Sequence, residues 1–479
     1  MMKMKMKIKI SPIRFLLKYF FLISFCGIYT FGKTQNIYKY AITFSDKGDN
    51  NPCSITNPKQ FLSARSIKRK KKLGISITNE DLPVNLNYVT EITKLIPSAQ
   101  VVNKSRWFNH IIIQTIDTNW KSSLSLPDFV SEIKLIYSGK LPKSTANRPY
   151  LPSKTGDQFS PKNIKNLSYE KSDFQIKSLN LQELHKEGFL GKDIHVAVLD
   201  GGFSNVDKIA AFHHLRINNR IKGTWDFASN ENEVYGDGEH GTMVLGCMAG
   251  FVKNKFLGTA PMASFWLFRT EDGDTETVVE EYNWISAAEF ADSAGVDIIN
   301  SSLGYTTFDN NIGSYSYKDM NGKTAISSRG ANKAVEKGIL VVNSAGNSGN
   351  DKWRYIGAPA DAEKVFSIGA ITKTKERATF SSFGPTSDGR IKPNVCALGL
   401  SASVIGSSGA VVESSGTSFS GPIICGSIAC LMSKHRYTKP EELMNAIQQS
   451  GSKANNPSNN LGYGIPDFFM ASKIISDKK

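Results

Sequence analysis

The chain has 479 residues, of which 40% are hydrophobic and 21% are charged, and its formal net charge at pH 7 is +15. This length gives room for two domains, and this hydrophobic content is ordinary for globular folding. The excess positive charge lies wholly in residues 1–155, because residues 156–479 carry 33 basic and 35 acidic side chains. Nucleic acid is therefore not expected as a partner of the larger part of the chain.

Residues 1–35 have the pattern of a secretory signal peptide. They carry seven Lys or Arg and no acidic residue, and an apolar core from Tyr19 to Phe31 follows the basic start. Cleavage is expected near Gly32 to Gln35, and bulky Phe25 directly before Cys26 argues against a lipidation site. The core is too short for a comfortable membrane span, so we expect a secreted or periplasmic protein without one. An uncleaved anchor is the alternative.

Residues 37 to about 140 alternate short strand-like runs with a basic helical patch. The predicted strands are Tyr38–Phe44, Gln100–Val102 and His110–Thr115, and the predicted helix is Pro58–Lys72. The basic run from Lys68 to Lys72 is interpreted as a solvated helix end. Between about 140 and 165 the chain is polar and rich in proline, which indicates an exposed linker and a natural place for a cut.

From about residue 165 onward, apolar strand-like runs alternate with helical segments, the signature of a parallel sheet flanked by helices. Ligand and active sites in such sheets gather beyond the carboxyl ends of the strands. The predicted strands are Ile194–Leu199, Ser264–Phe268, Val296–Asn300, Ile339–Asn343 and Val365–Ile371.

The cysteines show neither a CxxC pair nor a metal-binding spacing. Cys247, Cys425 and Cys430 lie in small-residue helical patterns, which favours buried structural thiols. A disulfide among these three and Cys396 stays open, since an oxidising compartment would permit one.

The most informative stretch is Gly416-Thr417-Ser418-Phe419-Ser420-Gly421-Pro422. A helical rhythm runs from Ile423 to His435, and Pro422 suits the first turn of a helix. Ser418 is thus expected at a helix N-terminus, where backbone N–H groups favour the negative charge that a nucleophilic oxygen develops. An N-cap serine is the alternative interpretation.

Three other segments add chemistry to this serine. Asp200 ends a predicted strand and precedes two glycines, so its carboxylate can point into a site. His240 opens a small-residue helical pattern, and an imidazole is suited to general-base catalysis. Asn347 follows an apolar strand and offers an amide donor, although Asn and Gly are also the default residues of an ordinary turn.

Taken together, these segments resemble the subtilisin-like serine proteases. The matching motifs are Asp200-Gly201-Gly202, His240-Gly241-Thr242, Ser302-Leu303-Gly304, Ala345-Gly346-Asn347 and Gly416-Thr417-Ser418, which span about residues 180–470. The order Asp, His, Ser is that of subtilisin.

The resemblance implies a serine endopeptidase with a triad of Asp200, His240 and Ser418 and an oxyanion hole that includes Asn347. It also implies substrate-binding backbone, which pairs with a peptide as an added strand. The implied substrate-binding residues are Ser302, Leu303, Gly304, Ala345 and Gly346. The expected partners are protein or peptide substrates, and the expected state is a monomer.

The resemblance further implies a subtilisin-like three-layer α/β fold with a mostly parallel central sheet, expected at residues 176–475. A small α+β prodomain at residues 36–150 would precede it, with a linker at residues 151–175. Such a prodomain is a removable propeptide that blocks the cleft as an intramolecular inhibitor. An independent binding domain retained after secretion is the alternative. No further domain is expected after Gly464-Ile465-Pro466.

One departure from the family is the stretch Thr306–Gly330, which is longer and more polar than a minimal connection. We expect a loop beside the cleft that shapes specificity, with a plain surface excursion as the alternative. No cofactor is expected to be required. Asp272, Asp274 and Glu276 could ligate structural calcium, but their spacing is not that of an EF-hand, which favours a solvated loop.

Two rival functions are weaker. An α/β-hydrolase esterase would have G-x-S-x-G with its histidine downstream, whereas position 420 is serine and His240 precedes Ser418. A secreted binding protein on a degenerate protease fold is disfavoured because all four chemical residues are present. Side-chain specificity is left open by the sequence.

Overall fold

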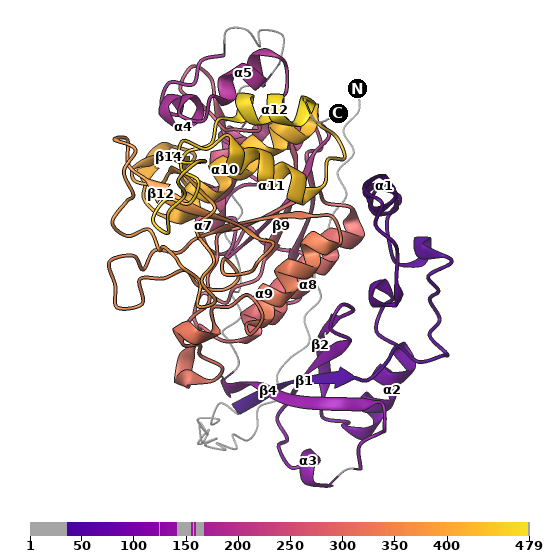
Figure 1. The fold of residues 1–479 in the computed structure, drawn as a ribbon. Coiled ribbons are helices and arrows are strands. Elements are labelled where there is room, and N and C mark those ends of the chain that lie inside the picture. Colours follow the sequence, from indigo (N-terminus) through magenta and orange to yellow (C-terminus); the bar gives the residue numbers. More distant parts are fainter. Residues whose placement is uncertain (1–35, 124, 141–154, 157, 160–166, 478–479) are drawn as a thin grey trace, which may run out of the picture. The chain divides into compact units, whose positions relative to one another are not determined.

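The computed structural model describes residues 36–477, apart from 124, 141–154, 157 and 160–166 (Figure 1). The predicted signal peptide and much of the predicted linker lie outside the described residues. No helix in the described part of the chain has both the length and the apolar character needed to cross a membrane.

The N-terminal part of the described chain is a four-stranded antiparallel sheet with short helices. The three predicted strands are confirmed, whereas the last strand and the second helix were not predicted. The sheet order is β2-β3-β1-β4, and the elements are β1 (Asn36–Phe44), α1 (Ala64–Leu73), α2 (Leu86–Leu95), β2 (Gln100–Ser105), β3 (His110–Thr115), α3 (Trp120–Ser123) and β4 (Val130–Lys140).

Both faces of this sheet are covered. In β3, Ile111 and Ile113 belong to a core with Val89 and Ile92 of α2. Ile112 points to the opposite face, because side chains alternate along a strand, and it belongs to a core with residues of α8 (Val279–Ala294) and α9 (Ile326–Glu336). The N-terminal sheet therefore shares an apolar interface with two helices of the larger domain.

The basic run in α1 is a solvated helix end only at Lys68, Lys71 and Lys72, and that interpretation was wrong for the other two residues. Arg69 is 3% exposed and Lys70 is 0% exposed. The guanidinium of Arg69 donates to Asp292 of α8, and Lys70 Nζ lies 3.0 Å from the same carboxylate. Buried charges need partners, and Asp292 supplies one to both cations.

The larger domain is built on a seven-stranded sheet in which every neighbouring pair is parallel. The five predicted strands are confirmed, whereas both edge strands were missed. The sheet order is β13-β12-β11-β10-β5-β9-β6, with β5 (His195–Asp200), β6 (Ile221–Asp226), β9 (Ser264–Arg269), β10 (Ile298–Ser301), β11 (Leu340–Ser344), β12 (Phe366–Ile371) and β13 (Val395–Leu398).

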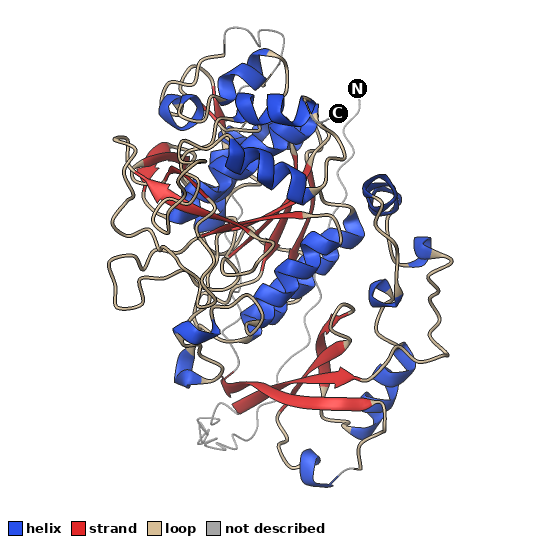
Figure 2. Ribbon diagram, in the orientation of Figure 1, coloured by secondary structure: helices blue, strands red, loops and turns tan. Residues whose placement is uncertain are grey.

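Helices cover both faces of this sheet and give three layers (Figure 2). Val196 and Val198 of β5 belong to one core with residues of α7 (His240–Ala249), α10 (Thr417–Lys434), α11 (Pro440–Gln449) and α12 (Phe468–Ser476), whereas Ala197 and Leu199 belong to another core with residues of α8 and α9. The remaining elements are α4 (Asp173–Lys177), α5 (Leu181–Lys186), α6 (His213–Ile217), β7 (Phe251–Val252), β8 (Phe256–Leu257), β14 (Ala402–Ile405) and β15 (Val411–Ser414).

The helix that carries the candidate nucleophile starts earlier than Pro422 suggested. It begins at Thr417, so Pro422 lies inside it rather than in its first turn. A proline has no N–H to donate to the carbonyl four residues earlier, which here is the carbonyl of Ser418. That carbonyl instead accepts a hydrogen bond of 3.0 Å from Ser302 Oγ. A contact from another strand end thus compensates for the proline.

Cys247, Cys396, Cys425 and Cys430 are buried, and none of these thiols forms a disulfide in the described part of the chain. Burial raises the pKa of Cys396 to about 12 and raises those of the other three still further. These cysteines are therefore protonated packing residues, as the sequence pattern favoured for Cys247, Cys425 and Cys430.

Candidate active site

The predicted site residues meet at the carboxyl-terminal end of the parallel sheet. Asp200 is the last residue of β5, Ser302 directly follows β10, and Asn347 follows β11. Because β5, β10 and β11 are parallel neighbours, their carboxyl ends lie side by side. His240 and Ser418, at the starts of α7 and α10, lie at the same end of the sheet.

Asp200 and His240 form a direct hydrogen bond. His240 Nδ1 lies 2.8 Å from Asp200 Oδ1, which also accepts from the backbone N–H of Gly201. The charge of Asp200 raises the pKa of His240 above its ordinary 6.5, because it favours the protonated ring. The carboxylate is fully buried while the imidazole side chain is 40% exposed, so the opposite edge of the ring can reach a substrate.

Ser418 lies in the first turn of α10 and is 8% exposed. Its Oγ is 3.5 Å from the carbonyl oxygen of Ser302, which is a long contact for a hydroxyl donor. The imidazole of His240 packs against the ring of the next residue, Phe419, with 5.9 Å between ring centroids. The weakly held hydroxyl can therefore turn toward the imidazole without breaking a strong bond.

The side chain of Asn347 is fixed with its nitrogen free. Its Oδ1 accepts from the backbone N–H of Thr417 at 2.8 Å and from Thr417 Oγ1 at 2.9 Å. Its Nδ2 makes no hydrogen bond within the described part of the chain. The preceding Gly346 has φ +105°, a left-handed conformation that favours glycine. Asn347 thus offers an N–H pair to a ligand beside Ser418.

A cavity of about 170 Å³ opens next to Ser418 and is lined by all five of the predicted substrate-binding residues. Its lining contains no charged side chain. Two aromatic residues, Trp353 and Tyr355, form part of its wall, and Ser382 contributes a hydroxyl that accepts from the N–H of Ser348 at 3.0 Å. The cavity therefore suits an uncharged side chain, since an unpaired buried charge would lose its hydration.

Comparison with known families decides what kind of protein this is. Residues 191–464, more than half of the chain, match the model of the Subtilase family, Peptidase S8. The chain belongs to the subtilase family. Residues 39–149 match a second model, the Peptidase S8 propeptide domain of Bacteroidota, which covers the N-terminal sheet.

Individual subtilases are similar over the larger domain. The chain is 32% identical to subtilisin NAT of Bacillus subtilis subsp. natto over 266 residues, which is 55% of this chain and 61% of that protein. It is 31% identical to subtilisin of Bacillus pumilus over 266 residues, or 85% of that protein. The chain thus spans less than two thirds of the length of subtilisin NAT.

A solved structure supports the fold of the subtilase over most of its length. The epidermin leader peptide processing serine protease of Staphylococcus aureus aligns with 91% of this chain and 99% of its own, with a TM-score of 0.58 and 17% sequence identity. At this identity the likeness concerns the fold alone. It agrees with the mostly parallel three-layer architecture expected from the sequence.

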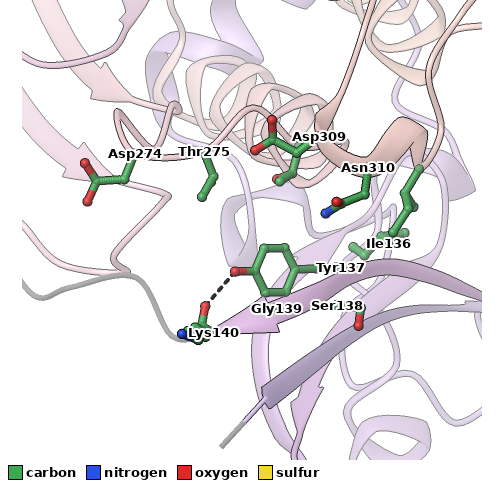
Figure 3. Close-up of a pocket in the computed structure, with 11 residues that line it drawn as sticks. Ile136, Tyr137, Ser138, Gly139, Lys140, Asp274, Thr275, Asp309 and Asn310 are labelled. Carbon is green, nitrogen blue, oxygen red and sulfur yellow. Dashed lines mark hydrogen bonds between the residues drawn. The ribbon is translucent and has the colours of Figure 1, made fainter. Parts of the chain in front are cut away.

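A second cavity, of about 570 Å³, lies between β4 and two loops of the subtilase (Figure 3). Tyr137 lies in this cavity, and its hydroxyl donates to the carbonyl of Lys140 at 2.6 Å. Asp274 and Asp309 line the other side. Asp200, His240 and Ser418 do not line it, so this cavity belongs to the contact between the N-terminal sheet and the larger domain.

Of the three acidic residues considered for calcium, Asp272 is engaged locally through its carboxylate, and Asp274 and Glu276 through their backbone N–H groups. Asp272 accepts from the N–H of Asp274 and from Thr275 Oγ1, both at 3.3 Å, and the N–H of Glu276 donates to Asp309. Within the described residues, no group of three His, Cys, Asp or Glu side chains is placed to hold a metal ion.

Sequence reasoning missed three contributors to the site. Thr417 orients the amide of Asn347, and Trp353 and Tyr355 form the cavity wall. Both aromatic residues follow Asn347 within eight positions in an otherwise polar loop. Large aromatic side chains in such a loop were the available signal, because they need a surface to pack against.

Proposed function

We propose that this subtilase is a secreted serine endopeptidase that uses Asp200, His240 and Ser418 as its catalytic triad. The observation that carries the proposal is the 2.8 Å hydrogen bond between His240 and Asp200 at the carboxyl-terminal end of the sheet, where Ser418 and Asn347 also lie. The neutral cavity beside Ser418 would take an uncharged side chain of the substrate, with the substrate backbone along Ser302–Gly304.

Each residue has a defined task in this mechanism. Ser418 Oγ attacks the carbonyl carbon of the peptide bond while His240 Nε2 takes the hydroxyl proton. Asn347 Nδ2 and the backbone N–H of Ser418 donate to the oxyanion of the tetrahedral intermediate. The C–N bond then breaks, and the leaving amine receives the proton from His240. Water repeats the sequence on the acyl-enzyme and restores Ser418.

Residues 36–150 would act as a propeptide that inhibits the enzyme until it is removed, with a linker at 151–175 and the peptidase domain at 176–475. Charge and packing support this part of the proposal, since Arg69 and Lys70 pair with Asp292 of α8. The C-terminal end of β4 and Asp309, in the loop that follows the candidate substrate-binding segment Ser302–Gly304, line the same cavity. Export would depend on the signal pattern in residues 1–35.

Removing the amide of Asn347 tests the oxyanion hole. The wild-type enzyme is expected to cut a denatured protein at internal bonds, and Asn347→Leu is expected to lower kcat about 10²–10³-fold with little change in KM. The matched control is Asn350→Leu, which alters an exposed asparagine in the same loop. Equal kcat in wild type and Asn347→Leu would contradict the assignment, as would an equal loss in the control.

Removing the charge of Asp292 tests the contact with the propeptide. In a full-length Ser418→Ala background, Asp292→Asn should leave Arg69 and Arg106 without the carboxylate that pairs with them, and Lys70 with Asp81 as its remaining partner, and lower the free energy of unfolding by about 3–5 kcal/mol. Urea denaturation at pH 7 measures this. The control is Asp173→Asn in an exposed ion pair with Lys177, for which less than about 1 kcal/mol is expected.

The same contact predicts a dependence on pH. Burial alone would raise the pKa of Asp292, but its cationic neighbours hold that pKa below the ordinary 3.8. The stabilisation is therefore present above pH 3.8 and lost as the pH falls through the lowered pKa. An Asp292→Asn variant as stable as its parent at pH 7 would remove this contact from the account.

A further inference from the structure

The aromatic wall of the 170 Å³ cavity is supported from outside by the extra segment between Thr306 and Met320. The rings of Tyr317 and Tyr355 stack, with centroids 4.1 Å apart and planes inclined by 28°. The hydroxyl of Tyr317 donates to the carbonyl of Pro385 at 3.0 Å and lies 3.2 Å from that of Thr386. Tyr317 thus connects the wall to a separate loop of the domain.

The supporting segment is itself anchored at both ends. The N–H of Tyr315 donates to the carbonyl of Thr306, a cavity residue, at 2.7 Å, and the N–H of Ser387 donates to the carbonyl of Met320 at 3.0 Å. Between Tyr315 and Met320 the chain forms a short 3-10 helix, Tyr317–Asp319. The carboxylate of Asp319 accepts hydrogen bonds from the N–H and the hydroxyl of Ser316, which precedes this helix. The position of the Tyr317 ring is therefore set by the fold of the segment.

The second aromatic wall residue rests on the same segment. Met320 is fully buried in a small apolar cluster with Ala325 and Ala358, and Trp353 packs against this cluster. Between the two wall residues, Arg354 has φ +52°, a left-handed conformation that costs an L-residue other than glycine roughly 1–2 kcal/mol. A wall built on a strained loop residue needs outside contacts to keep one conformation.

We propose that Tyr317 is a positioning residue for substrate selection, acting through Tyr355 at the cavity wall. The inference rests on the proposed protease function. With the stack in place, Tyr355 stays packed and the cavity can exclude water from an apolar side chain of the substrate. Without the stack, Tyr355 becomes more mobile and water enters the cavity. Apolar side chains of the substrate then bind less well, and charged side chains lose less of their hydration when they enter.

The test is a peptide series that differs only in the residue before the cleaved bond, with leucine compared against glutamate and lysine. Tyr317→Ala is expected to lower the ratio of kcat/KM for leucine over either charged residue about tenfold, with the change mainly in KM for the leucine peptide. Tyr317→Phe keeps the ring and should retain the wild-type ratio within about twofold, since the stack rather than the hydroxyl contacts Tyr355. Titration with a covalent serine reagent counts the active enzyme in every sample.

An unchanged ratio in Tyr317→Ala would overturn the inference, as would an equal loss of kcat/KM for all three peptides. If Tyr317→Ala does not fold, Tyr355→Ala is measured in its place, because it removes the wall residue directly and should lower the ratio similarly. A wild-type enzyme that fails to react with the serine reagent at Ser418 would refute the proposed function instead. Labelled enzyme with an unaltered ratio would refute only the role of Tyr317.

Discussion

Replacing Ser418 with alanine is expected to abolish proteolysis, with kcat falling about 10⁶-fold, because the nucleophilic oxygen is removed while the fold is kept. Ser418 is 8% exposed, and among the residues that the structure describes its hydroxyl makes one hydrogen-bond contact, of 3.5 Å, with the carbonyl of Ser302. Loss of that long contact should leave stability nearly unchanged. Hydrolysis of a denatured protein, followed by kcat determination, measures the effect.

The same variant tests whether the propeptide is removed by the enzyme itself. We expect Ser418→Ala to keep residues 36–150, whereas mass spectrometry of the active wild-type protein should find a mature N-terminus beyond them. The matched control is Ser420→Ala, which removes another hydroxyl two residues along α10, one that donates to the carbonyl of Thr417. Activity in Ser418→Ala equal to that of the wild type would contradict the triad assignment. A fully active protein that starts near residue 36 would contradict the assignment of residues 36–150 as a removable propeptide.

Replacing Asp200 with asparagine is expected to lower kcat about 10⁴-fold, because the amide no longer stabilises the imidazolium or holds the ring in the productive tautomer. It should also shift the pH profile. His240 must be neutral to accept a proton from Ser418, so kcat/KM falls as the pH drops below the pKa of His240. The charge of Asp200 raises that pKa, and the acid limb of the wild-type profile should therefore have its midpoint above pH 6.5.

In Asp200→Asn the charge that raises the pKa of His240 is gone, while burial, which lowers this pKa, remains. The midpoint of the acid limb should then move to lower pH even though activity is lower throughout. Profiles of kcat/KM between about pH 4 and 9 measure both effects. Asp477→Asn, at an exposed position after α12, is the control and should match the wild type. An acid limb that stays in place would show that Asp200 does not set the charge state of His240.

Much of the central sheet and the makeup of the site could be predicted from sequence, because both depend on local patterns. A strand buried on both faces is a continuous apolar run, as in Ile339–Asn343. Parallel strands place their carboxyl ends at the same end of the sheet. The edge strand β6 was missed for the same reason, whereas β13, although apolar and fully buried, is a run of only four residues, which periodicity alone cannot distinguish from a helix segment. The segment Ile221–Asp226 mixes polar, glycine and aromatic residues, since an edge strand that is half exposed carries no continuous apolar signal.

The sequence by itself determined which groups we propose as reactive: the serine near a helix start, the histidine at another, and the aspartate and asparagine after strand ends. Only the tertiary structure decided how these groups are held. Ser302 Oγ satisfies the carbonyl that Pro422 leaves open, and Thr417 turns the amide of Asn347. Asp292 pairs with the buried side chains of Arg69, which lies 223 residues earlier in the chain, and of Lys70, the residue after it. The physical reason is range, since a motif records the chemistry of neighbours along the chain, whereas hydrogen bonds and ion pairs form between whichever groups folding brings within about 3 Å.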